Sequence, residues 1–168
     1  MGDAGVTILT LKLDSSSQAY FDALRKRHFP PERNRIPAHL TLFHALPATA
    51  EVREVLQAEA DSVRSFPMRV ARVASMGHGV AFFLESPQLQ TLHRLLSQSF
   101  EPFLNAQDRM GFRPHVVVQN KVAPDEAKTT LTRLEAQFTP FNVQAEGLGW
   151  WNYLGGPWKW REGFDFAP

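Results

Sequence analysis

Two stretches of the sequence decide the fold: PAHLTLF at residues 37–43 and RPHVVVQNK at residues 113–121. In each stretch a histidine, His39 or His115, closely follows a proline and begins a run rich in leucine, threonine or valine. Short runs of this kind, bounded by proline, are typical of β-strands. We therefore predict that each histidine stands at the beginning of a strand.

Strand parity divides both stretches into a covered face and a polar face that begins with the histidine. In the first strand, His39 shares its face with Thr41 and Phe43, and the apolar face holds Leu40, Leu42, His44 and Leu46. In the second strand, the polar face holds His115, Val117, Gln119 and Lys121, opposite Val116, Val118, Asn120 and Val122. On this pattern, His44 is expected to be a core histidine with an internal hydrogen-bond partner.

The elements around the two histidine strands occur in the same order in both halves of the chain. The first half is predicted to have strands at residues 6–13, 39–46 and 68–75, and helices from the capping segment 14–17 to about residue 28 and over 51–65. The second half is predicted to have strands at 80–85, 115–122 and 141–147, helices that begin at residues 87 and 124, and a hairpin that turns at 155–156. This order predicts an α+β fold with a single domain over residues 1–168. The domain would consist of two similar lobes, roughly 1–77 and 78–168, each a small, mainly antiparallel sheet covered by helices.

Composition excludes several classes of function. The chain has 168 residues, enough for one domain of about 150 residues, and its formal net charge is +1. A net charge this close to zero excludes strong non-specific binding to a long polyanion. A local basic patch is still compatible with it. The absence of cysteine excludes disulfides, thiolate zinc sites and a cysteine nucleophile. No apolar run approaches the roughly 20 residues of a membrane span. We expect a cytoplasmic monomer that does not bind membranes.

Two histidines on the polar faces of two strands suit phosphoryl transfer. In-line attack on phosphorus needs a base for the attacking hydroxyl or water and an acid for the leaving oxygen. Imidazoles with an ordinary pKa of about 6.5 share these tasks near neutral pH without a metal. A hydroxyl two residues after a histidine points the same way along the strand, so Thr41 is placed to donate to a phosphate oxygen.

The same residues resemble a known family. HLTL at residues 39–42 and HVVV at 115–118 resemble the paired His-x-Ser/Thr-x signatures of the two-histidine phosphoesterase superfamily, which includes 2′-5′ RNA ligases and 2′,3′-cyclic phosphodiesterases. The surrounding letters, and WWNYLGGPW at residues 150–158, resemble its bacterial RNA-ligase-like branch. The resemblance covers nearly the whole chain, since the order of the lobes also fits.

The resemblance implies a central groove with one histidine from each lobe, and neither a metal nor another cofactor. It implies hydrolysis of a 2′,3′-cyclic phosphate end of a nucleotide or RNA to a 2′-phosphate, or the reverse reaction, 2′-5′ joining. By position in the motifs, His39 and His115 would form the acid/base pair and Thr41 would bind the phosphate.

Val117 departs from the pattern of the family, which has Ser or Thr there. The loss of one donor to a charged phosphate costs about 1.5–3 kcal/mol, or roughly 10- to 150-fold in rate, unless Arg113, Gln119 or Lys121 replaces it. Two functions therefore stay open: a metal-independent phosphoesterase, or a nucleotide- or RNA-end-binding module whose second motif is degenerate.

Weaker signals surround these motifs. Arginines in the loops before the histidine strands either bind phosphate or are solvated; they are Arg33, Arg35, Arg109 and Arg113. All four tryptophans lie between residues 150 and 160, where they either stack on a base or pack in the hairpin. His93 is expected on the surface of a helix.

Overall fold

The computed structural model describes residues 5–168; residues 1–4 of the predicted domain lie outside this part. Its strands are β1 (Val6–Leu13), β2 (Leu40–Pro47), β3 (Phe66–Ser75), β4 (Val80–Glu85), β5 (His115–Gln119), β6 (Phe141–Tyr153) and β7 (Trp158–Asp165). Its helices are α1 (Ser15–His28), α2 (Ala50–Ser62), α3 (Pro87–Phe100), α4 (Ala106–Arg109) and α5 (Pro124–Gln137), with 3-10 turns η1 (Pro31–Arg33) and η2 (Glu101–Phe103). The hairpin predicted at residues 155–156 connects β6 and β7.

All of these strands form one antiparallel sheet with the order β2-β1-β6-β3-β4-β5, and β7 pairs with β6 beside this path. The long strand β6 joins the two ends of the sheet, because Ala145 pairs with Leu13 of β1 on one edge and with Phe66 of β3 on the other. The predicted fold class, α+β with a mainly antiparallel sheet covered by helices, is confirmed.

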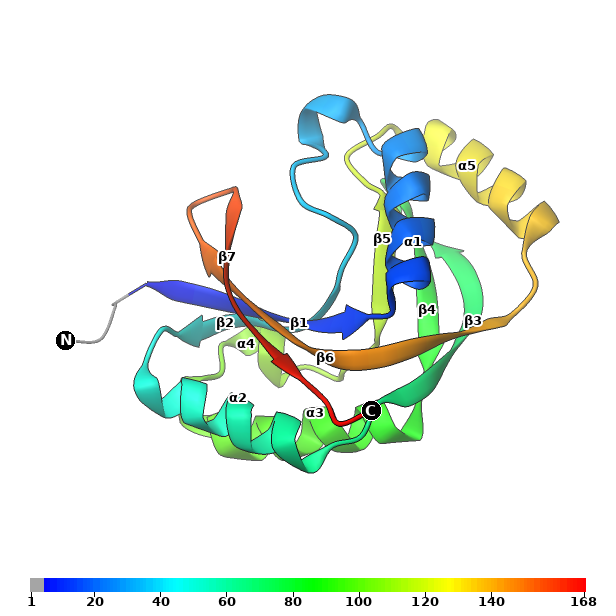
Figure 1. Ribbon diagram of the computed structural model, residues 1–168. Helices are drawn as coiled ribbons and strands as arrows, with labels where there is room; N and C mark the ends of the chain where they lie inside the picture. The colour runs from blue at the N-terminus through cyan, green and yellow to red at the C-terminus, as the bar shows by residue number, and fades with distance from the viewer. Residues whose placement is uncertain (1–4) are drawn as a thin grey trace.

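Each end of the sheet combines strands from both halves of the sequence. β6, from the second half, pairs with β1, and β3, from the first half, pairs with β4. The histidine strands β2 and β5 stand at the two ends of the strand order but lie against each other, so the sheet is strongly bent (Figure 1). α1 and α5 cover the end formed by β3, β4 and β5, while α2 and α3 pack together at the other end (Figure 1).

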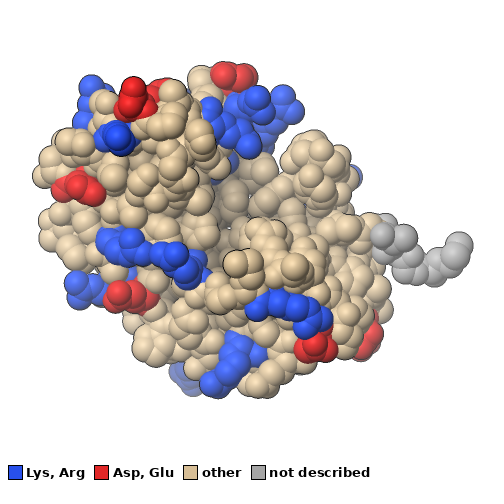
Figure 2. All heavy atoms as spheres, turned by 180° about the vertical axis from the view of Figure 1, so that it is seen from behind, with Lys and Arg blue, Asp and Glu red and all other residues tan. Residues whose placement is uncertain are grey.

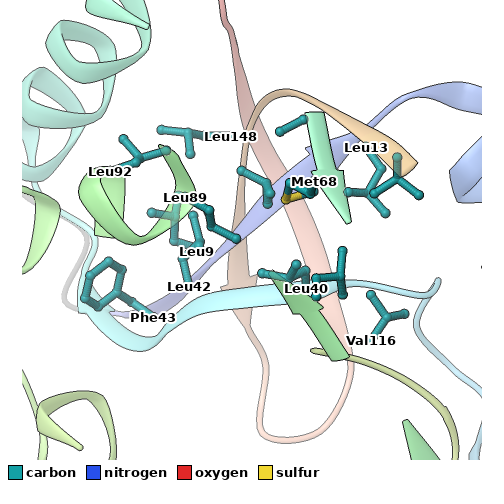
Figure 3. Close-up of a cluster of buried hydrophobic side chains, with 14 of the residues drawn as sticks. Leu9, Leu13, Leu40, Leu42, Phe43, Met68, Leu89, Leu92, Val116 and Leu148 are labelled. Atoms are coloured by element: carbon teal, nitrogen blue, oxygen red, sulfur yellow. The ribbon is translucent and has the colours of Figure 1, made fainter. Parts of the chain in front are cut away.

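One buried cluster of side chains fills the space between the sheet and the helices (Figure 3). It includes Leu40 of β2 and Val116 of β5, which are both completely buried. These two residues directly follow His39 and His115, so each histidine is anchored by its neighbour in the core. Because successive side chains of a strand alternate, this anchoring turns both histidines away from the core.

The parity predicted for β2 fails after Leu42 because the strand contains a β-bulge. Thr7 of β1 lies opposite Leu46 and Leu9 lies opposite Phe43, so β2 carries one more residue than β1 between these pairs. The extra residue interrupts the alternation of faces. Phe43 is therefore completely buried, whereas the side chain of His44 is 43% exposed. The prediction of His44 as a core histidine is wrong.

His93 occupies the core position instead. It is buried on α3, with Nε2 at 3.1 Å from the main-chain oxygen of Leu42. Its ring is stacked between those of Phe43 and Phe112, at centroid distances of 4.6 and 3.8 Å. The predicted surface position of His93 is therefore wrong, because the bulge turns Phe43 toward α3 and forms an aromatic slot for the imidazole.

Among residues 5–168, no helix is both long and apolar enough to cross a membrane. In the same part of the chain, no group of three or more His, Cys, Asp or Glu side chains is arranged to hold a metal ion. The expectation of metal-independent chemistry stays a prediction that a chelator tests.

Asp14 connects the start of α1 to the central strand. Its carboxylate accepts hydrogen bonds from the main-chain N–H of Ser17 at 3.1 Å and of Gln144 at 2.8 Å. Burial alone would raise the pKa of Asp14, but the donors from Gln144, Ser17 and Ser16 outweigh it and lower the pKa. The carboxylate therefore serves as helix cap and as a link to β6 at the same time.

We expect Asp14→Ala to lower the free energy of unfolding by about 1–3 kcal/mol, since it removes a helix cap and leaves the Gln144 amide without this acceptor. Urea denaturation followed by circular dichroism measures the difference. Asp61→Ala is the matched control, because this exposed carboxylate on α2 contacts the amide of Gln57 within its own helix. Equal losses in the two variants would contradict the role assigned to Asp14.

Candidate active site

His39 lies directly before β2 and is held by a short-range hydrogen bond. Its Nδ1 is 2.8 Å from the main-chain oxygen of Pro37. The preceding residue, Ala38, is fixed by α1: its N–H donates to Asp22 at 2.8 Å and its oxygen accepts from the Gln18 amide at 2.7 Å. The helix therefore positions the turn from which the imidazole projects.

His115 repeats this arrangement at the start of β5. Its Nδ1 is 2.7 Å from the main-chain oxygen of Arg113, again two residues earlier in the chain. Its ring packs against Phe83 of β4, with 5.4 Å between centroids and 24° between planes. A carbonyl accepts only from an N–H, so both rings carry a proton on Nδ1 and present Nε2 for proton transfer.

The surroundings of His39 favour its neutral form. Burial lowers the pKa of the His39 imidazole to about 4; the Pro37 carbonyl opposes this shift, and the positive charge of Arg25 adds to it. The charges of His115 and His44 act in the same direction. The ring of Trp158 covers one side of His39 at 4.6 Å between centroids. Near pH 7, Nε2 of His39 is thus an unprotonated acceptor.

Thr41, Arg113 and His115 line a common cavity of about 220 Å³. His44 and Gln107 also line it. His39 lines a second cavity of about 230 Å³, together with Trp151 and Trp160. The face shown in Figure 2 is hollowed near its middle and carries Lys and Arg side chains in separate groups. Asp and Glu side chains also lie on this face (Figure 2), and the formal net charge of the chain is +1.

The structure brings Arg113 to the cavity but not every polar residue predicted for it. The Arg113 guanidinium lies 5.3 Å from the centroid of the Phe83 ring, beside His115. Gln119 is buried, and its amide donates to Thr130 of α5 at 2.8 Å, so it faces the helix and not a substrate. Lys121 is exposed beyond the end of β5, with a left-handed φ of 62°.

Two charged groups near the histidines were not predicted from the sequence. Arg25 of α1 is buried and donates through Nη1 to the main-chain oxygen of Val117 at 3.1 Å. Asp108 of α4 is buried and binds the ring and main chain of His44. The sequence did offer a signal for the burial of Arg25: it follows Phe21 by four residues, so both side chains lie on the inner face of α1. No sequence signal connects Asp108 to His44.

The paired histidine strands at the groove fit the two-histidine class that the sequence resembles. A profile of the 2′-5′ RNA ligase superfamily matches residues 13–157. The chain therefore belongs to the 2′-5′ RNA ligase superfamily, and the resemblance seen in its motifs is confirmed. Membership supports an activity of the phosphoesterase or RNA-ligase-like kind. No curated protein matches the chain.

Solved structures share the fold at low sequence identity. LigT from Escherichia coli, in complex with 3′-AMP, has a TM-score of 0.63 and 17% identity over 99% of this chain and 100% of its own. TT0787 from Thermus thermophilus has a TM-score of 0.67 and 15% identity over 96% and 97%. Usb1 from Kluyveromyces marxianus, with uridine monophosphate, has a TM-score of 0.50 and 14% identity over 98% and 99%.

The lowered pKa of His39 predicts a dependence of stability on pH. The unfolded imidazole titrates near about 6.5, and the folded one at about 4. Between these values the unfolded chain binds more protons, so stability falls as the pH falls from about 6.5 to about 4, by no more than about 3 kcal/mol for this group. His39→Gln should flatten that decline in urea titrations between pH 7 and pH 4.

His28 and His93 also have a lowered pKa, through burial above all. Both remain in the variant, so the difference between the two proteins isolates His39. Parallel curves for wild type and His39→Gln would show that the folded protein does not hold this imidazole in its neutral form.

Proposed function

We propose that this protein is a metal-independent phosphoesterase that hydrolyses 2′,3′-cyclic phosphate ends of nucleotides or RNA. The observation that carries the proposal is the matched pair of imidazoles: each Nδ1 is tied to a carbonyl two residues earlier, at 2.8 Å for His39 and 2.7 Å for His115. Membership of the 2′-5′ RNA ligase superfamily supports it. So do the nucleotides bound by the similar folds, among them 3′-AMP in LigT and uridine monophosphate in Usb1.

His39 is assigned as the general base. Its pKa, lowered to about 4 by burial, keeps Nε2 free of a proton at neutral pH. It takes the proton of the attacking water while the water oxygen bonds to phosphorus. His115, on the other strand, gives a proton from Nε2 to the ribose oxygen that leaves. Each turnover exchanges the protonation states of the two rings, and proton exchange with solvent resets them.

Thr41 and Arg113 are assigned to the phosphate itself. Both line the cavity of His115. The Thr41 hydroxyl donates to a non-bridging oxygen, and the Arg113 guanidinium balances the negative charge that develops in the transition state. Arg113 is the residue assigned to replace the hydroxyl that Val117 lacks. Gln119 and Lys121 have no role in this proposal because of their positions.

The first test is hydrolysis of nucleoside 2′,3′-cyclic phosphates in EDTA. His39→Ala and His115→Ala should each lower kcat by about 10²- to 10⁴-fold, the contribution of one acid or base. His78→Ala is the matched control: its Nδ1 also contacts a main-chain oxygen, that of Val122, but it lies in an exposed turn. Turnover within a few-fold of wild type in either active-site variant would refute the acid/base pair.

Restoring the second motif tests the effect of the missing hydroxyl. Valine and threonine side chains have nearly the same shape, so Val117→Thr adds a hydrogen-bond donor with little change in packing. We expect kcat/KM for the cyclic phosphate to rise by roughly 10- to 150-fold. An unchanged rate would mean that Arg113 already replaces the hydroxyl, or that the substrate lies away from Val117.

A binding module without turnover is the second candidate, because Val117 departs from the motif. Saturable binding of a 2′-phosphorylated nucleotide by calorimetry, with no hydrolysis even in Val117→Thr, would favour it. Joining of RNA ends that carry a 2′,3′-cyclic phosphate and a 5′-hydroxyl, at high RNA concentration, tests the reverse reaction. Monomeric state and cytoplasmic location remain predictions from the sequence.

A further inference from the structure

A third imidazole, that of His44, lines the cavity of Thr41, Arg113 and His115. The acid/base mechanism uses two histidines and leaves this one without a task. Its side chain is 43% exposed, so it is accessible from the cavity. The bulge in β2 directs the His44 side chain out of the core, and the same bulge interrupts the regular pairing of β2 with β1.

Asp108 holds the His44 ring in a defined orientation. The carboxylate is 2% exposed, and Oδ1 lies 2.8 Å from Nδ1 of His44. Burial alone would raise the pKa of Asp108, but the donors from His44 and Ala45 outweigh it and lower the pKa. The carboxylate is therefore ionised and requires an N–H at Nδ1. His44 lines the cavity of His115. When the ring is protonated, its Nε2–H is a donor for an anion, and Asp108 supplies the counter-charge at Nδ1.

The imidazole is not needed to hold the bulge. Asp108 also accepts hydrogen bonds from the main-chain N–H groups of His44, at 2.9 Å, and of Ala45, at 3.1 Å. These amides remain when the side chain at position 44 is changed. A histidine is therefore not required at position 44 to hold the bulge. A purely structural role would also leave the exposed Nε2 of its oriented ring without a function.

The size of the cavity limits what lies between His44 and His115. About 220 Å³ is below the roughly 300–1,000 Å³ of pockets that enclose a whole ligand of drug size. The cavity suits a phosphate and a ribose better than a complete nucleotide with its base. A cyclic phosphate at His115 leaves room in the same cavity for its ribose, whose 5′ oxygen can be directed toward His44.

We propose that His44, oriented by Asp108, binds a second phosphate of the substrate, the one attached to the 5′ oxygen of the nucleotide that carries the cyclic phosphate. This inference rests on the proposed function. It assigns His44 as a residue that determines specificity: a substrate with a 5′-phosphate or a phosphodiester at this position is preferred over a nucleoside 2′,3′-cyclic phosphate with a free 5′-hydroxyl.

The test compares substrates that differ only at the 5′ oxygen. Adenosine 2′,3′-cyclic phosphate is compared with its 5′-phosphorylated form and with a dinucleotide that ends in the same cyclic phosphate. In His44→Gln, kcat/KM should fall about 10-fold or more for the two longer substrates, mainly through KM, as expected for a lost hydrogen bond to a charged group. The loss for the cyclic nucleoside phosphate should be at least several-fold smaller, because this substrate has no phosphate on its 5′ oxygen.

A loss on the dinucleotide but not on the 5′-phosphorylated nucleotide would assign the site to the phosphodiester of an RNA chain, and the reverse result to a terminal 5′-phosphate. An equal loss on all three substrates, or none on any, would overturn the inference. Equal melting temperatures of His44→Gln and wild type exclude a folding defect.

A binding measurement separates the failure of this inference from the failure of the proposed function. Calorimetry compares adenosine 2′-monophosphate with adenosine 2′,5′-bisphosphate, a pair that differs by the 5′-phosphate and needs no turnover. His44→Gln should reduce the gain in affinity between the two ligands about 10-fold. If wild type hydrolyses nothing but shows this gain and its loss, the subsite stands and the phosphoesterase activity does not. If the gain is absent in wild type, the subsite is refuted.

Discussion

The pairing of both edges of β6 is the constraint on which the rest of the structure depends. Ala145 bonds to β1 on one side and to β3 on the other, so a single strand carries the ends of the sheet that hold His39 and His115. Without it, each histidine strand would stand at the edge of a separate small sheet. With it, the sheet bends and β2 lies against β5. Backbone pairing therefore brings the two histidine strands together, and the contacts of Ala38 with α1 position the turn that holds His39.

Within this frame, the orientation of each histidine is a local matter. Leu40 and Val116, the residues that follow the histidines, are completely buried and fix the direction of the side chains. The carbonyls of Pro37 and Arg113 then fix the ring tautomers. Strand alternation is readable from sequence and predicted the polar face that each histidine begins. The contacts of Nδ1 with the carbonyls two residues earlier come from the structure alone.

The parts of the site that sequence did not predict are those formed by long-range contacts. The β-bulge in β2 depends on Asp108, which lies 64 positions further along the chain, and strand parity has no means of including such a partner. The same bulge exchanged the predicted environments of His44 and His93. Gln119 was misplaced for a related reason: parity placed it on the face of His115, but its side chain is buried at the end of β5, where its amide donates to Thr130 of α5. The order of the predicted elements needed only local patterns and agrees with the structure, although β6 ends at Tyr153, six residues beyond the predicted end, and α4 was not predicted.

The contacts that sequence missed share one property: each connects a histidine strand to a charged residue from the other half of the chain. Arg25, from the first half, binds the carbonyl of Val117 in β5, and Asp108, from the second half, binds the main chain of His44 in β2. Both charges are buried, and a buried charge without its partner is strongly unfavourable. Arg25 lies on α1, which precedes β2, and Asp108 lies on α4, which precedes β5, so each contact ties one histidine strand to the segment that leads into the other. Loss of either contact would leave a buried charge without that partner, so both contacts favour the observed arrangement of the two strands.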